Sequence, residues 1–327
     1  MRRMLMDLGD RLYLFDLLEH GLPGRSSGYL YAGTQTVLFD TGSARCLPQI
    51  LRALSALGKS PADLDYVVLT HAHLDHAGGA GQLARIAERA TFVAHPRAAR
   101  HLAAPSRLIE GTRAVYGERY DSLFGEVIPI QKDRLIARED GDTLDIGDRI
   151  LHFYDTPGHA RHHFCIHDPA RNAVFTGDAL GIRYVKQFTG ENFEFILPSS
   201  SPTDFDPVGV RYTVDKLSRL QADTVYHAHF GPSPAREALH ATETGAFAFA
   251  NLSSKAYHPG MTAKEMTAVL AKHVTAHLAK LGHPEMDADH LGDDLWLDGM
   301  GLVHYERTRS SRAESSRTDT RSDKPSM

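Results

Sequence analysis

The stretch VVLTHAHLDHAGG, residues 67–79, places three histidines and one aspartate directly after an apolar run. The apolar run is typical of a buried strand. Because side chains alternate along an extended segment, His71 and His73 can point to the same side. Asp75 and His76 lie where the chain must turn, next to two glycines that allow a tight bend. The pattern therefore predicts two pairs of polar side chains presented at the end of one strand.

These side chains form a candidate metal site. Imidazole and carboxylate ligands in this mixture suit zinc, and also iron or manganese. The alternative is a polar loop whose histidines bond to the backbone and to water. That alternative suits a lone histidine, but the density of such groups between residues 71 and 76 favours metal binding. Four ligands are too few for two closed metal sites, so we expect further ligands at the ends of other strands.

Three more strand-to-loop junctions each carry a candidate ligand. His159 follows a strand and a Pro-Gly turn in FYDTPGHARHH, Asp178 follows the strand of AVFTGDAL, and His229 follows the strand of TVYHAHFGPS. Junctions of this kind present site residues on rigid elements. His227 is an alternative to His229, because it lies two residues earlier on the same strand and can face the same way.

The composition is that of an ordinary globular protein. The chain has 327 residues and a formal net charge of -5. Its charge therefore favours neither nucleic acid nor an anionic membrane as a partner. No apolar run approaches the roughly 18 residues of a membrane span, and the start of the chain, MRRMLMDLGD, does not resemble a signal peptide. We expect a cytoplasmic protein that acts on a small-molecule substrate.

Strand-rich segments followed by helical segments occur twice. TVLFDTG (36–42) and AVFTGD (173–178) are both apolar strands that end with an acid and a glycine. Two similar halves would pack two sheets face to face with helices outside, an α/β fold of the αββα sandwich type. We assign residues 1–240 to this catalytic domain.

The C-terminal part is predicted to be helical. MTAKEMTAVLAKHVTAHLAKLG (261–282) has one apolar face. We expect residues 241–307 to form a helical appendage that packs on the sandwich or on a second copy of the chain in a homodimer. Residues 308–327 have no apolar pattern and are rich in Ser, Arg and Asp, which predicts a disordered tail.

The motifs HAHLDH, GHA, TGD and HFGP, in this order and spacing, closely resemble those of the metallo-β-lactamase fold superfamily. The resemblance covers roughly residues 12–240 and implies a four-layer αββα sandwich with a dinuclear metal centre. Two zinc ions per chain are expected, with iron or manganese as alternatives.

The resemblance also implies a role for each candidate ligand. One metal would be held by His71, His73 and His159, the other by Asp75, His76 and His229, and Asp178 would bridge them. Asp40, in LFDTG, matches the acid that orients a metal-bound histidine in that family.

The bridging position separates branches of the family. Class B β-lactamases usually carry cysteine there, so Asp178 argues against antibiotic hydrolysis. It favours the branch that resembles type II glyoxalases and lactonases. The expected reaction is hydrolysis of an ester, thioester, lactone or related carbonyl compound by water whose pKa the metals lower. Asp75 would orient the attacking water as well as bind metal.

Three other functions remain open. A persulfide dioxygenase shares part of the ligand set but uses one iron ion, held by two histidines and the aspartate. A metal-dependent nuclease would need a basic strip, which the net charge does not indicate. The site could also be a structural metal site without activity.

Six residues are candidates for substrate contact. His162 and His163 follow His159 closely, with the alternative that they are polar residues at the start of a strand. Tyr184 is the nearest tyrosine after Asp178, although it does not clearly match the tyrosine of lactonases. The stretch NFEFILPSSSPTDFDP (192–207) is predicted to form a lid or a specificity wall, with Phe193, Phe195 and Leu197 facing the substrate. The alternative for this stretch is an ordinary surface crossing.

Overall fold

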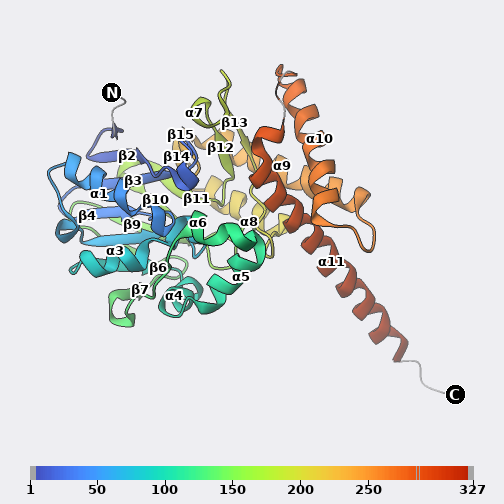
Figure 1. Ribbon diagram of the computed structural model, residues 1–327, viewed down its shortest axis with the longest axis horizontal. Coiled ribbons are helices and arrows are strands. Elements are labelled where there is room, and N and C mark those ends of the chain that lie inside the picture. The colour runs from blue at the N-terminus through green and yellow to red at the C-terminus, as the bar shows by residue number, and fades with distance from the viewer. Residues whose placement is uncertain (1–4, 285, 287, 323–327) are drawn as a thin grey trace.

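The computed structural model describes residues 5–284, 286 and 288–322 (Figure 1). Within these residues, two sheets carry the fold. The first has seven strands, which follow one another across the sheet as β1 (Met6–Asp7), β2 (Leu12–Asp16), β3 (Ser27–Ala32), β4 (Thr36–Phe39), β5 (Tyr66–Leu69), β6 (Thr91–Ala94) and β7 (Leu135–Ala137). The second has six strands, in the order β15 (Gly231–Pro234), β14 (Thr224–His227), β11 (Ala173–Gly177), β10 (Phe164–Asp168), β9 (Ile150–Asp155) and β8 (Thr143–Asp145).

The two sheets pack face to face through a shared apolar core. The rings of Phe39 in β4 and Phe175 in β11 are stacked, with their centroids 3.8 Å apart. In β5, Val68 lies in this core, while Val67 and Leu69 lie in a second core on the other face of the sheet. This alternation is the one expected for an extended run, and it makes β5 apolar on both faces.

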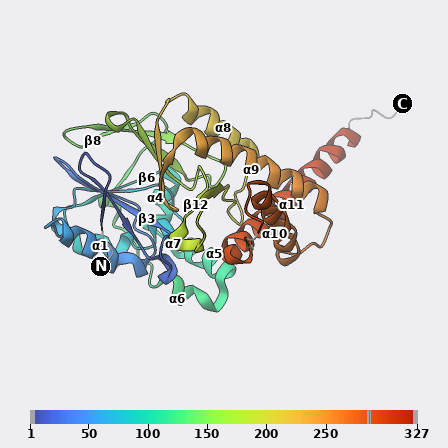
Figure 2. The same cartoon turned by 90° about the horizontal axis from the view of Figure 1, so that it is seen from above.

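Helices cover the outer face of each sheet (Figures 1 and 2). On the first sheet, apolar side chains of α1 (Leu47–Ala56), α3 (Ala80–Ile86) and α4 (Pro96–Ala103) form the outer core. On the second, α8 (Pro207–Ser218) and α9 (Ala235–Ala256) pack against residues of β11 and β14. This order of layers confirms the predicted αββα sandwich.

The predicted C-terminal helices are present. The buried face of α10 (Ala263–Lys280) consists of Met266, Leu270, Val274 and Leu278. These side chains share a core with α9 and with α11 (Gly292–Ser322). The apolar face of α10 is therefore covered within the chain, and the homodimer stays a prediction. None of the helices in the described part of the chain has the length and apolar character needed to cross a membrane.

The predicted domain limits fall inside helices. The limit after residue 240 lies within α9, and the limit after residue 307 lies within α11. The division into domains therefore stays a prediction. The predicted tail, residues 308–327, begins inside α11, and its end, 323–327, lies outside the described residues.

The stretch 192–207 is more regular than the sequence suggested. Residues Phe195–Leu197 form β13, which pairs with β12 (Ile182–Tyr184), and α7 (Lys186–Thr189) lies between these two strands along the chain. An irregular segment remains between β13 and α8, and it contains the three consecutive serines 199–201.

Candidate metal centre

All seven predicted ligands lie where strands of the two sheets end. His71 and His73 follow β5, and the short helix α2 (Leu74–Ala77) carries Asp75 and His76. The second sheet supplies the others, which are His159 between β9 and β10, Asp178 after β11 and His229 between β14 and β15. The structure thus brings together side chains that are far apart in the sequence.

The first group consists of His71, His73 and His159. Nδ1 of His73 lies 2.9 Å from Nε2 of His71 and 3.0 Å from Nε2 of His159. A tetrahedral zinc ion with nitrogen ligands at about 2.0–2.1 Å would hold such nitrogens roughly 3.3 Å apart. The three imidazoles are therefore arranged so that they could hold one metal ion.

The second group consists of Asp75, His76 and His229, and it could hold another ion. Nε2 of His76 and Nε2 of His229 are 3.3 Å apart. Oδ2 of Asp75 lies 3.7 Å from the first of these nitrogens and 3.6 Å from the second.

Asp178 lies between the two groups. Its Oδ1 is 3.3 Å from Nε2 of His76 and 3.4 Å from Nε2 of His229, while its Oδ2 is 3.5 Å from Nε2 of His159. Oδ1 is buried and has no hydrogen-bond partner among the described residues. A buried carboxylate oxygen without a donor is costly, and a bound cation would remove that cost. The donor set and this orphaned oxygen together fit a metal centre.

Each of three imidazoles is anchored through the nitrogen that faces away from the cluster. Nδ1 of His76 contacts Oδ2 of Asp40 at 3.1 Å, Nδ1 of His159 contacts the carbonyl of Ser199 at 3.2 Å, and Nδ1 of His229 contacts the carbonyl of Arg25 at 2.9 Å. Because these oxygens accept hydrogen bonds, each Nδ1 is the donor. Nε2 is then the nitrogen that faces the cluster, and in the neutral imidazole it carries the lone pair that a metal requires. Asp40 thus contacts a candidate ligand as the sequence predicted.

The pKa values of His71, in the first group, and His76, in the second, shift in opposite directions. Burial and the nearby His76 imidazole lower the pKa of His71 well below its usual value. Burial also lowers the pKa of His76, but the Asp178 and Asp75 carboxylates outweigh it and raise that pKa well above its usual value. His71 is therefore neutral and ready to bind a cation, whereas His76 would release a proton on binding one.

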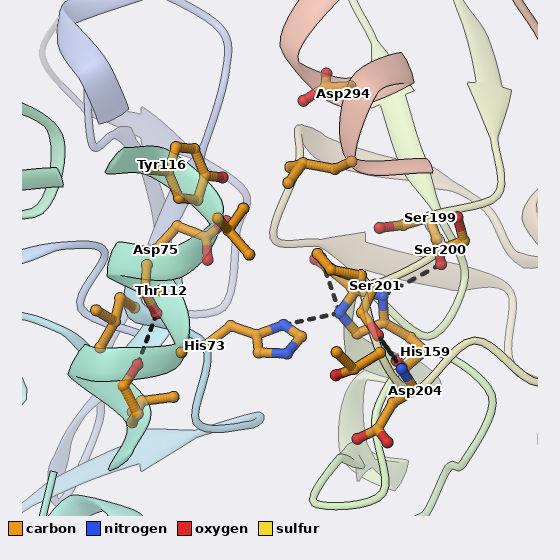
Figure 3. Close-up of a pocket in the computed structure, with 18 of the residues that line it drawn as sticks. His73, Asp75, Thr112, Tyr116, His159, Ser199, Ser200, Ser201, Asp204 and Asp294 are labelled. Atoms are coloured by element: carbon orange, nitrogen blue, oxygen red, sulfur yellow. Dashed lines mark hydrogen bonds and ion pairs between the residues drawn. The ribbon is translucent and has the colours of Figure 1, made fainter. Parts of the chain in front are cut away.

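A cavity of about 280 Å³ opens on the cluster. Figure 3 shows its two sides, with Thr112 and Tyr116 of α5 (Ser106–Tyr116) beside Asp75, and the serine segment 199–201 beside His159. Apolar side chains line much of the wall, and they are Leu74, Leu108, Val115, Phe124, Ile182 and Leu297. A concave apolar wall with a few placed polar groups is typical of a site for a small molecule.

Of the two histidines predicted after His159, one reaches the cavity. His162 lines it and accepts a hydrogen bond from the backbone N–H of Ala72, at 3.3 Å. His163 instead supports Asp178 from behind. Its Nε2 accepts from the backbone N–H of Asp178 at 3.3 Å, and its Nδ1 contacts the hydroxyl of Thr156 at 2.8 Å.

Tyr184, Phe193 and Phe195, predicted as substrate contacts, do not line this cavity. Phe195 is buried in β13, where its ring stacks on that of Tyr184 with centroids 4.9 Å apart. Phe193 packs against the same apolar core, which also includes α9, α10 and α11. The hydroxyl of Tyr184 donates to Asp294 at 3.1 Å. These three rings are structural because β12 and β13 pack under the C-terminal helices.

His227 is not an alternative ligand. Its Nε2 contacts the hydroxyl of Ser233 at 2.8 Å, and its Nδ1 contacts the carbonyl of Gly181 at 3.3 Å. Both ring nitrogens are therefore occupied by neighbours outside the cluster. At this strand end it is His229 that faces the cluster, and its role as a ligand stays a prediction.

The sequence did not point to several residues that line the cavity. Arg25 comes from the segment before β3, and Asp294 and Asp298 come from α11. The two aspartates are four positions apart on a helix, a spacing that is equally typical of a solvated face. The opposite wall is different, because the serine run 199–201 lies within the stretch 192–207 that the sequence predicted to be a lid or a specificity wall.

Comparison with known proteins identifies the family. The model of the metallo-beta-lactamase superfamily matches residues 21–229, more than half of the chain. The metallo-beta-lactamase fold-containing protein ST1585 of Sulfurisphaera tokodaii is 29% identical over 64% of this chain and 74% of its own length. The acyl-coenzyme A thioesterase MBLAC2 of Gallus gallus is 28% identical over 63% of this chain and 73% of its length. The hydroxyacylglutathione hydrolase of Hahella chejuensis is 28% identical over 54% of this chain and 52% of its length.

Solved structures agree on the fold. The metallo-beta-lactamase family protein TTHA1429 from Thermus thermophilus superposes with a TM-score of 0.67 at 20% identity, covering 93% of this chain and 95% of that chain. The crystal structure of ST1585, described as from Sulfolobus tokodaii, gives a TM-score of 0.62 at 21% identity, covering 89% and 97%. Together with the matched model, these likenesses show that the chain belongs to the metallo-β-lactamase superfamily.

Proposed function

We propose that this protein is a metal-dependent hydrolase that uses two metal ions to cleave a thioester or related ester bond in a small-molecule substrate. The observation that carries this proposal is the position of Asp178, whose two carboxylate oxygens face ligand groups on opposite sides. Relatives named as acyl-coenzyme A thioesterase and hydroxyacylglutathione hydrolase support the same reaction class.

The proposed ligands divide between two sites. His71, His73 and His159 would hold one ion, Asp75, His76 and His229 the other, and Asp178 would contact both. Imidazole nitrogens and carboxylate oxygens are donors that would suit zinc. Two ions held there would lower the pKa of a water molecule that they share and polarise the carbonyl group of the substrate.

The side chains around the site would orient the attacking water and exclude bulk solvent from the substrate. Asp75 is the more exposed of the two carboxylates in the cluster and lines the cavity, so it is placed to accept a hydrogen bond from the attacking water. Asp178 is almost fully buried and acts through its position between the two groups. The apolar wall formed by α5 and α11 would exclude bulk water from the substrate and strengthen these interactions.

Metal analysis and turnover test the proposal together. We expect the purified full-length chain to contain two zinc ions and to hydrolyse members of a panel of acyl thioesters and esters. His71→Ala and Asp178→Ala should lower bound metal and reduce turnover by roughly a hundredfold or more. His277→Ala and Asp215→Ala are matched controls at exposed helix positions and should change neither property. One iron ion in place of two zinc ions, or full activity in both site variants, would overturn the proposal.

A further inference from the structure

The first turns of α11 form part of the active-site cavity. Asp294, Leu297 and Asp298 all line it, and their spacing places them on one face of the helix. Figure 3 shows Asp294 at the edge of the cavity, on the ribbon of α11. Both aspartates are buried, with 5% and 4% of their surface exposed. Burial of a carboxylate destabilises the fold unless the group is hydrogen-bonded or paired with a cation. The partners of these two aspartates therefore indicate what holds the helix in place.

Asp294 connects α11 to the second group of ligands. Nη2 of Arg25 donates to Oδ1 of Asp294 at 2.6 Å, and Nη1 donates to Oδ2 at 3.3 Å. The carbonyl oxygen of Arg25 in turn accepts from Nδ1 of His229 at 2.9 Å. One residue thus holds the helix with its guanidinium group and a candidate metal ligand with its backbone.

Asp298 connects α11 to the first group of ligands in the same way. Oδ1 of Asp298 accepts from the backbone N–H of Ser200 at 2.7 Å and from its hydroxyl at 2.9 Å. The carbonyl oxygen of the preceding residue, Ser199, accepts from Nδ1 of His159 at 3.2 Å. The hydroxyl of the following residue, Ser201, donates to the carbonyl of His159 at 2.7 Å.

A glycine in α11 shows that this contact is close. A Cβ atom at Gly301 would lie 2.5 Å from the carbonyl oxygen of Ser201 and 2.9 Å from the hydroxyl oxygen of Ser200. No side chain fits there without moving the helix or the serine segment. Helix α11 therefore packs directly against the serine segment 199–201, whose backbone contacts His159.

We infer that α11 helps to build the metal centre. Asp294 and Asp298 act as positioning residues, each for one histidine of one proposed site. Each aspartate fixes a backbone segment, and each segment presents one carbonyl oxygen to the Nδ1 of a ligand histidine. This inference rests on the proposed function, because it assumes that His159 and His229 bind metal. Groups that orient a ligand histidine typically change metal affinity by about ten- to a hundredfold when they are removed.

The inference predicts that each aspartate affects one site and not the other. His229→Ala leaves the His71, His73 and His159 site as the sole complete one, and His159→Ala leaves the other. In the His229→Ala background, Asp298→Ala should weaken zinc binding by about tenfold, and Asp294→Ala should have little effect. In the His159→Ala background, Asp294→Ala should weaken zinc binding by about tenfold, and Asp298→Ala should have little effect.

The measurement is calorimetric titration of the chelator-treated full-length protein with zinc chloride, without substrate. Asp293→Ala is the matched control, because Asp293 is the neighbouring residue on α11 and pairs with Arg119 at the surface. Asp298→Asn keeps the acceptor for Ser200 and should retain near-normal affinity. If Asp294→Ala does not fold, Asp294→Asn keeps an acceptor for Arg25 and should show a smaller loss at the same site.

The outcomes separate this inference from the proposed function. Two zinc ions in the wild type, with unchanged affinities in both alanine variants, would overturn the role of α11 and leave the proposed function standing. Equal weakening of both sites by either variant would also overturn it, because a general loss of stability would then explain the data. A wild-type chain that binds no zinc would overturn the proposed function and this inference with it.

Discussion

Oδ2 of Asp40 lies 3.1 Å from Nδ1 of His76, on the side of the imidazole opposite the nitrogen that faces the cluster. The same carboxylate accepts hydrogen bonds from the backbone N–H of Thr70 at 2.8 Å and from its hydroxyl at 2.9 Å. Thr70 is the last residue before His71. Asp40 therefore ties the end of β5 to the orientation of His76, so that one buried acid aligns ligands of both proposed sites.

Replacement of Asp40 by asparagine tests this alignment. The amide keeps an acceptor for Thr70 but loses the negative charge that favours the Nδ1 proton of His76. We expect zinc affinity to fall by about ten- to a hundredfold, and kcat to fall with it. Calorimetric titration and steady-state kinetics would measure both effects. Asp65→Asn is the control, because Asp65 also accepts a backbone N–H, from Thr36 at 2.8 Å, at the opposite end of β4. Equal zinc affinity in Asp40→Asn and wild type would contradict the prediction.

A second prediction concerns pH and Asp298. Burial raises the pKa of Asp298 to about 8 in the folded, metal-free protein, from the ordinary value of 3.8. Between these values the folded protein keeps a proton that the unfolded chain has released. This group therefore lowers the free energy of unfolding progressively as pH rises from about 4 to about 8, and its effect is constant above that range.

Asp298→Asn removes this dependence because an amide does not ionise. The stability of the variant relative to wild type should rise across the same pH range and then level off. Urea unfolding in the presence of a chelator, repeated at several pH values, would measure the difference. Asp293→Asn, at a more exposed position of the same helix, is the matched comparison variant. A flat difference for Asp298→Asn would mean that Asp298 is ionised throughout.

The sequence predicted the sandwich and the cluster because both are encoded in short segments. The apolar run before His71 and the turn residues after it are neighbours in the chain, and β5 has the alternating burial that the run indicates. The contacts around the cluster are of a different kind. Arg25 and Asp294 are 269 positions apart, and no local pattern marks either of them as a partner of the other.

The position of Phe193 and Phe195 away from the cavity has a physical reason as well. In NFEFIL, apolar and polar side chains alternate at first, a pattern that suits a wall facing a ligand and a strand facing a core equally well. The structure resolves the choice because Phe195 pairs with Tyr184 across β12 and β13, under the C-terminal helices. The location of those helices could not be predicted from the sequence, because the apolar face of an amphipathic helix indicates that it is covered but not which surface covers it.

A third prediction concerns substrate size and Leu297. This side chain lies on the cavity wall between the two buried aspartates of α11. Leu297→Trp should fill part of the space, so kcat/KM for thioesters with longer apolar groups should fall by roughly tenfold relative to the shortest one. A series of acyl thioesters of increasing chain length would measure the ratio. Leu281→Trp, at an exposed position, is the control and should leave the ratio unchanged. An unchanged ratio in Leu297→Trp would place the substrate elsewhere.

A fourth prediction concerns the contact between α11 and the serine segment. Gly301→Ala introduces a methyl group 2.5 Å from the carbonyl oxygen of Ser201, so the helix and the segment must move apart. We expect a loss of about 1–3 kcal/mol in the free energy of unfolding, as for other overpacked sites. Because the segment also orients His159, zinc affinity in the His229→Ala background should fall severalfold.

The matched control for this change is Gly292→Ala, at the first residue of the same helix. A Cβ atom there meets nothing within 4 Å, and alanine favours the helix over glycine, so the variant should be as stable as wild type or slightly more so. Thermal unfolding and zinc titration of both variants would make the comparison. A loss of stability in Gly301→Ala without a loss of zinc affinity would confirm the close packing of α11 on the serine segment. It would refute the link to His159, because the displacement at Ser201 would then leave the carbonyl of Ser199 in place.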